Sequence, residues 1–107
     1  MSSKYVKYQR MKWEKKISKG GKVDCGICGN QILPNNNFGL GPLSMDHIVP
    51  KSFGGMNKRY NLRPTHRYCN AYRSNRMLYI ITVKYQKKID TYKIEYQRTQ
   101  KLQKALL

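Results

Sequence analysis

The sequence predicts a small α+β domain with a basic helix on either side of it. Two stretches without glycine or proline, residues 4–19 and 70–107, carry apolar side chains at helical spacing among many lysines and arginines. Between them lie two short apolar runs, residues 43–49 and 61–64. The polar, glycine-containing segment that separates these runs is typical of a long hairpin loop. We therefore expect one hairpin packed between helices.

The charge of the chain indicates a polyanionic partner. Its 107 residues include 22 lysines and arginines but only 5 acidic residues, a formal charge of +17. Self-repulsion of this size favours binding to nucleic acid. An anionic membrane surface is the competing partner, but there is no long apolar span. Because residues 1–10 lack the apolar core of a signal peptide, we expect an intracellular protein, in a cytoplasm or nucleoid, a phage-infected cell or an organelle, and not a secreted one.

The N-terminal basic stretch is predicted to be an amphipathic helix. Val6, Trp13 and Ile17 recur at helical spacing, and Gly20-Gly21 ends the pattern. A solvated arm with one face docked on the core is the alternative. These boundaries divide the chain into a basic N-terminal helix or arm (1–22), a central core (23–77) and a basic C-terminal helical extension (78–107).

Two paired motifs predict a tetrahedral zinc site. Cys25-x-x-Cys28 supplies one half, and His66-x-x-Cys69 supplies the other. Thr65 is a plausible N-cap for a helix that begins near His66, and residues three apart on a helix share a face. Three thiols and one imidazole suit Zn²⁺. A redox role for the first cysteine pair is the weaker alternative, because the second half-site argues for metal.

A second group of polar residues could hold a hard cation and activate water. Asp46 and His47 are adjacent in the run 43–49, so a strand end or bulge is needed for both to serve one site. Asn70 follows Cys69 directly and can therefore face the hairpin, about 100° around a helix. The oxygens of Asp46 and Asn70 suit Mg²⁺, and a free imidazole can accept a proton near neutral pH. The alternative is a solvated aspartate beside a packed histidine.

The C-terminal stretch carries an apolar stripe at steps of three or four residues, which predicts one face of a helix. The stripe consists of Leu78, Ile81, Tyr85, Ile89, Tyr92 and Tyr96. Residues 78–85 are also rich in β-branched and aromatic types, so a strand is an alternative there. We expect the stripe to pack on the N-terminal helix or on a second copy of the chain. The basic residues on the other faces could follow a phosphate backbone or only keep the chain soluble.

The ordered motifs together resemble the HNH endonucleases, and the resemblance covers residues 25 to about 76. The matching motifs are Cys25-x-x-Cys28, Met45-Asp46-His47-Ile48-Val49-Pro50-Lys51-Ser52-Phe53-Gly54-Gly55, Asn61-Leu62-Arg63-Pro64 and His66-Arg67-Tyr68-Cys69-Asn70. The resemblance implies a ββα-metal, treble-clef-like core with a structural zinc. The chain departs from the commonest pattern at Asn70, where other members carry histidine, and at His66, which replaces a cysteine.

The resemblance implies a metal-dependent DNA endonuclease, and RNA is the alternative nucleic-acid partner. His47 would be the general base, Asn61 would brace its loop, and Asp46 and Asn70 would bind catalytic Mg²⁺ or Mn²⁺. A structural zinc would be held by Cys25, Cys28, His66 and Cys69. Phosphates could be gripped by Lys51, Arg63, Arg67, Arg73 and Arg76.

One active site per chain predicts a nick by a monomer. A double-strand or junction cut would need two copies, and the C-terminal helix could form the seam of such a homodimer. A mobile or homing nuclease and a junction resolvase both fit this description. The alternative function is a non-catalytic, zinc-stabilised nucleic-acid-binding module in a larger assembly, for which the basic charge and the tyrosines would suffice.

Overall fold

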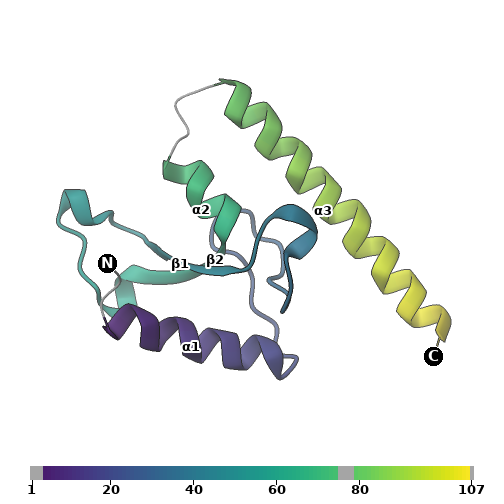
Figure 1. Cartoon of the computed structure of the whole chain (residues 1–107), viewed down its shortest axis with the longest axis horizontal. Helices are drawn as coiled ribbons and strands as arrows, with labels where there is room; N and C mark the ends of the chain where they lie inside the picture. Colours follow the sequence, from purple (N-terminus) through teal and green to yellow (C-terminus); the bar gives the residue numbers. More distant parts are fainter. Residues whose placement is uncertain (1–3, 75–78, 107) are drawn as a thin grey trace.

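The computed structural model describes residues 4–74 and 79–106, and its architecture confirms the predicted α+β fold. A two-stranded antiparallel sheet lies at the centre, and α1 and α2 lie on its two sides, while α3 runs obliquely beside α2 (Figure 1). The helices and strands of the described residues are α1 (Lys4–Ser18), β1 (Leu43–His47), β2 (Leu62–His66), α2 (Arg67–Ser74) and α3 (Tyr79–Leu106).

The register of the sheet decides which side chains face which helix. Leu43 pairs with His66 and Asp46 pairs with Arg63. Because successive strand residues point to opposite faces, Met45 is directed away from Asp46. Met45 packs with Val6 of α1, whereas Asp46 contacts α2. Ser44 and Asp46 of β1 are thus presented to α2, and α1 covers the face that carries Met45.

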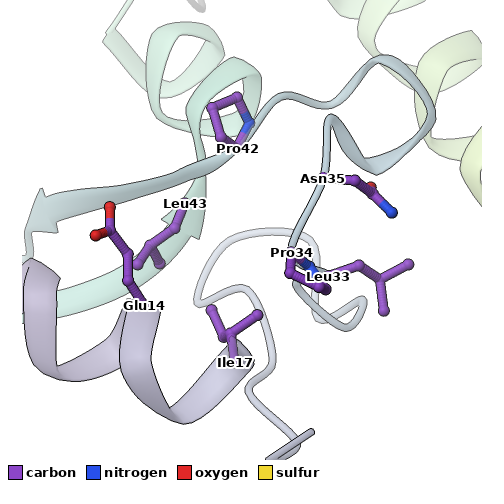
Figure 2. Close-up of a pocket in the computed structure, with 7 residues that line it drawn as sticks. All are labelled: Glu14, Ile17, Leu33, Pro34, Asn35, Pro42 and Leu43. Carbon is purple, nitrogen blue, oxygen red and sulfur yellow. The ribbon is translucent and has the colours of Figure 1, made fainter. Parts of the chain in front are cut away.

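Helix α1 forms where the sequence predicts it and ends one residue earlier, at Ser18. Val6 and Ile17 are buried and Trp13 packs against the core, so the predicted apolar face is the one that contacts the rest of the chain. The end of α1, the loop before β1 and the first residue of β1 line an open pocket of about 280 Å³ (Figure 2). This pocket is lined by Glu14, Ile17, Leu33, Pro34, Asn35, Pro42 and Leu43.

The loop before β1 is ordered by one buried asparagine. Asn37 adopts a left-handed conformation (φ 53°), which asparagine tolerates better than most residues. Its amide group accepts a hydrogen bond from the Leu33 N–H at 2.7 Å and donates to the carbonyls of Leu33, Asn35 and Gly41. The loop therefore presents Leu40 to the core, where it is fully buried.

The second helix begins close to the predicted position, but its N-cap differs from the prediction. Strand β2 continues through Thr65 and His66, and α2 begins only at Arg67. Thr65 is therefore not an N-cap: its hydroxyl donates to the Ser44 carbonyl across the sheet at 3.0 Å. The strand pairing of His66 with Leu43 outweighs the local capping preference of threonine. His66 reaches the metal site from a strand end, not from a helical face.

Helix α3 packs on the loop around Asn37–Gly39 and on α2. This corrects the expectation that its stripe packs on the N-terminal helix. The ring of Tyr85 stacks on Tyr72 of α2, with centroids 3.9 Å apart, and Tyr92 is 2% exposed. The strand alternative for residues 78–85 is wrong for its described part, which is helical from Tyr79. Leu78 lies outside the described residues, as does the side chain of Ile81. Within the described part of the chain, every helix is too short or too polar to cross a bilayer.

Candidate metal centre and active site

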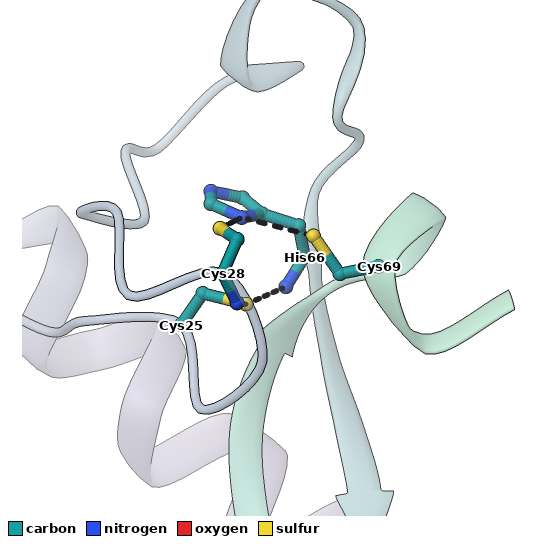
Figure 3. Close-up of side chains that lie close together, drawn as sticks. All are labelled: Cys25, Cys28, His66 and Cys69. Atoms are coloured by element: carbon teal, nitrogen blue, oxygen red, sulfur yellow. Dashed lines mark hydrogen bonds between the residues drawn. The ribbon is translucent and has the colours of Figure 1, made fainter. Parts of the chain in front are cut away.

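The two half-sites converge on one point. The ligand atoms of Cys25, Cys28, His66 and Cys69 all lie within 4.8 Å of one another (Figure 3). The Nδ1 atom of His66 is 3.4 Å from the Cys28 sulfur and 3.7 Å from the Cys69 sulfur. Ligands of a tetrahedral zinc ion, at Zn–S distances of about 2.3 Å, are separated by about 3.5–3.8 Å. The four residues therefore fit a structural zinc.

Backbone groups around the site are aimed at its ligands. The N–H groups of Ile27, Cys28 and His66 point to the Cys25 sulfur at 3.4–3.5 Å. The remaining ring nitrogen of His66, Nε2, lies 3.2 Å from the Gln31 carbonyl. A carbonyl can only accept, so Nε2 carries the proton and Nδ1 is left to bind a metal ion.

The negative charge of the cysteine thiolates in this cluster favours binding of a cation. The neighbouring thiols of Cys28 and Cys69 lower the pKa of Cys25, whereas Cys25 and Cys28 raise the pKa of Cys69. The cause is that each further negative charge in the cluster costs more than the one before. Burial would lower the pKa of His66, but hydrogen bonds to Cys25 and Cys28 outweigh it and raise this pKa to about 9. A bound Zn²⁺ compensates three thiolates and displaces the imidazole proton.

Tyrosines of α3 close the outer side of the metal centre. Tyr92 donates its hydroxyl proton to the same Gln31 carbonyl that faces His66, and Tyr96 donates to the Gln31 side-chain oxygen at 2.8 Å. Burial raises the pKa of Tyr92, so its hydroxyl stays neutral and remains a donor. The C-terminal helix is in this way joined to the zinc site through Gln31, a connection that the sequence analysis missed.

The imidazole of His47 is held by the loop that follows it. Its Nε2 atom lies 2.6 Å from the side-chain oxygen of Asn57. Since an amide oxygen accepts, Nε2 carries the proton and Nδ1 is left as the basic nitrogen. Asn57 was not singled out from the sequence, where it is one polar residue among several in a long loop.

Asn61 connects the two ends of that loop. Its side chain accepts from the Val49 N–H at 2.8 Å and donates to the carbonyls of Val49 (3.1 Å) and Met56 (2.8 Å). The residue is 4% exposed. Gly55 allows the close passage of the chain here, because a Cβ atom on it would lie 1.7 Å from the Val49 carbonyl oxygen.

Asp46 is enclosed by two arginines. Arg73 donates through Nη1 to both carboxylate oxygens at 2.8 Å, and Arg63 donates through Nε to Oδ2 at 2.9 Å. The Asp46 side chain is only 6% exposed. Its partners thus differ from those of His47, which faces Asn57.

Asn70 lies on the same side of the sheet as Asp46 but contacts an earlier part of β1. Its Nδ2 donates to the Ser44 hydroxyl at 3.1 Å and to the Met45 carbonyl at 3.3 Å. Ser44 and Asp46 share a face of the strand, and Asn70 and Arg73 share a face of α2. The carboxylate and amide oxygens are the donor types that suit Mg²⁺, but guanidinium groups hold the carboxylate.

The residues predicted to contact phosphate lie in different parts of the structure. Arg63 and Arg73 line a hollow of about 250 Å³ together with Tyr72, and Arg67 lines a second hollow beside Asn70. Lys51 begins the short 3₁₀ turn Lys51–Phe53 in the loop after β1 and is exposed. Arg76 lies outside the described residues.

Residues 25–76 match the model of the family described as HNH endonuclease. The chain contains an HNH endonuclease domain. The match spans the metal ligands, both strands and α2, which agrees with the ββα arrangement of the structure. No curated protein matches the sequence significantly. An HNH domain with a zinc-binding group supports a role on nucleic acid.

Proposed function

We propose that this protein is a metal-dependent DNA endonuclease that hydrolyses one phosphodiester bond per active site. The observation that carries the proposal is the imidazole of His47, which Asn57 holds inside an HNH domain and which is next in sequence to Asp46. A module that only binds nucleic acid has no need for a histidine whose tautomer is set by a dedicated asparagine.

In the proposed reaction, Nδ1 of His47 accepts a proton from the attacking water, while Asn57 keeps the ring oriented. Asn61 holds the loop on which Asn57 lies. Asp46 and Asn70 are the proposed ligands of Mg²⁺ or Mn²⁺, which when bound would stabilise the charge that develops on the phosphate and the leaving oxygen. The products would carry 5′-phosphate and 3′-hydroxyl ends.

Binding of the substrate would rely on basic and aromatic side chains around the loop 48–60. Lys51, Arg59 and the aromatic residues Phe53 and Tyr60 are all exposed there; Phe53 is 80% exposed and Tyr60 is 73% exposed. Cations neutralise phosphates and exposed rings offer surfaces on which bases stack. RNA could bind by the same contacts. Cutting of both strands or of a junction would need two copies of the chain.

A second candidate function is a non-catalytic nucleic-acid-binding module with a structural zinc. The observation that favours it is the carboxylate of Asp46, both oxygens of which are bonded to arginine. A carboxylate that only stabilises the fold would have such partners.

The two functions are separated by nicking of supercoiled plasmid DNA in Mg²⁺. We expect the native chain to produce the open-circular form and His47→Ala to lose at least about two orders of magnitude of this rate, the contribution typical of a general base. Both proteins should retain their zinc and their affinity for DNA. Equal nicking by both would remove His47 from its role, and binding by the native chain without nicking would favour the non-catalytic module.

A further inference from the structure

The two arginines that bind the Asp46 carboxylate also bind backbone carbonyls. Besides its two bonds to Asp46, Arg73 donates to the carbonyls of His47 and Ile48, each at 2.7 Å. Arg63 also donates to the Gly26 carbonyl at 3.0 Å. The Arg73 guanidinium therefore joins α2 to the end of β1, and the Arg63 guanidinium joins β2 to the loop between Cys25 and Cys28.

This arrangement opposes binding of a divalent cation. Both oxygens of Asp46 already accept hydrogen bonds, and two positive guanidinium groups accompany one negative carboxylate. Arginine keeps its charge under all ordinary conditions, so its repulsion of a cation is removed only when the group moves. The carboxylate can become a ligand only after Arg73 has released it.

A phosphate is the group best suited to take Arg73 away. Guanidinium binds phosphate and carboxylate with the same two-pronged geometry. The side chains of Arg63 and Arg73 are 29% and 25% exposed, so both can be reached from solvent, whereas Asp46 is covered. Both arginines line the hollow of about 250 Å³, which Gly26, Ile27 and Tyr72 complete.

We propose that Arg73 is a latch that couples binding of nucleic acid to binding of the divalent cation. A backbone phosphate draws the Arg73 guanidinium from Asp46, which frees a carboxylate oxygen for the cation. The coupling is reciprocal, so the cation strengthens binding of nucleic acid by the same factor. The inference rests on the proposed function insofar as Asp46 is taken as the ligand of the cation.

The test measures binding of Mn²⁺ by the electron paramagnetic resonance signal of the free ion, in a His47→Ala background that prevents turnover. Zinc-loaded protein is titrated with and without a short DNA duplex, and the duplex alone is the blank. We expect DNA to tighten binding of Mn²⁺ by about tenfold or more, within the usual range of coupling between sites. Arg73→Ala should bind Mn²⁺ tightly without DNA and lose most of the coupling.

Three further variants keep the result interpretable. Lys104→Ala removes an exposed positive charge from α3 that is not a partner of Asp46, so it should keep the coupling. Arg73→Lys keeps the charge but lacks the fork, and it replaces Arg73→Ala if the latter does not fold with zinc; it should bind Mn²⁺ more tightly without DNA than the native residue does. If the His47→Ala protein, in which Arg73 is intact, binds Mn²⁺ tightly without DNA and DNA does not change this affinity, the latch alone is overturned. Asp46→Asn in the same background should lose Mn²⁺ binding, and Mn²⁺ binding by Asp46→Asn that equals that of its His47→Ala parent overturns the proposed cation site as well.

Discussion

Replacement of Asn61 by alanine should loosen the loop that orients His47 while leaving the zinc core intact. The substitution removes three hydrogen bonds, to the Val49 N–H and to the carbonyls of Val49 and Met56. At about 0.5–1.5 kcal/mol for each bond, the upper total is about 4.5 kcal/mol. Val49 and Met56 are 46% and 52% exposed, so water can replace part of what is lost. We expect a cost of about 2 kcal/mol, confined to the loop.

Amide hydrogen exchange read by NMR measures this cost residue by residue. A loss of about 2 kcal/mol corresponds to about 30-fold faster exchange at Val49. The Cys25 N–H, which bonds to the Asn30 carbonyl at 2.8 Å, reports on the zinc core and should stay protected. Asn61→Asp keeps the acceptor for Val49 but sets a carboxylate oxygen against two carbonyls, so it should be at least as harmful. Exchange at Val49 and nicking that both stay at native levels in Asn61→Ala would refute the reasoning.

Three further substitutions or conditions test other parts of the structure. Gly55→Ala should accelerate amide exchange at Val49 as strongly as Asn61→Ala does, because the new Cβ atom would lie 1.7 Å from the Val49 carbonyl oxygen. As a control, the Cβ atom of Gly54→Ala meets no atom within 4 Å, so this variant should cost only the roughly 1–2 kcal/mol of a left-handed alanine. Equal acceleration of exchange by Gly55→Ala and Gly54→Ala would argue against the steric contact. Tyr92→Phe should lower the free energy of unfolding in urea by about 1 kcal/mol, the worth of its bond to Gln31, and Tyr96→Phe, which is less buried, should lower it less. Zinc affinity, measured by competition with a chelating dye, should rise as the pH increases from about 6 towards 9. The reason is that zinc binding displaces a proton from His66, whose pKa is raised to about 9, and protons from the thiols. A zinc affinity that is independent of pH would contradict the assigned ligands, and Cys69→Ser should lower the zinc content at every pH.

The elements that the sequence predicted correctly are those set by local pattern. Residues of α1 repeat at helical spacing, and the paired spacing of cysteines and histidine leaves one sensible set of ligands, which the structure brings together. The N-cap of α2 was wrongly assigned because Thr65 has the local features of a cap, but its hydroxyl bonds across the sheet. A preference of this size is overridden by strand pairing, which sequence periodicity does not reveal.

The surroundings of the candidate site could not be predicted for a related reason. Arg73 is one of 22 basic residues, and nothing in its neighbourhood distinguishes a latch on Asp46 from a surface charge. Asn57 likewise lies in a polar loop whose path depends on contacts to Asn61 and Gly55. The stripe of α3 identifies which face is buried but not against what, and its partner is the loop around Gln31 and α2.

The proposed function requires that zinc stabilises the fold and that a second, hard cation is needed for cleavage by the residues that this fold brings together. It is tested most directly by plasmid nicking with protein that has been stripped of zinc and dialysed, and then given Zn²⁺, Mg²⁺, both or neither, with near-ultraviolet circular dichroism of the same samples. We expect Zn²⁺ alone to restore the folded spectrum without nicking, and nicking only with both ions. Nicking without Mg²⁺, or a native spectrum without zinc, would contradict the account.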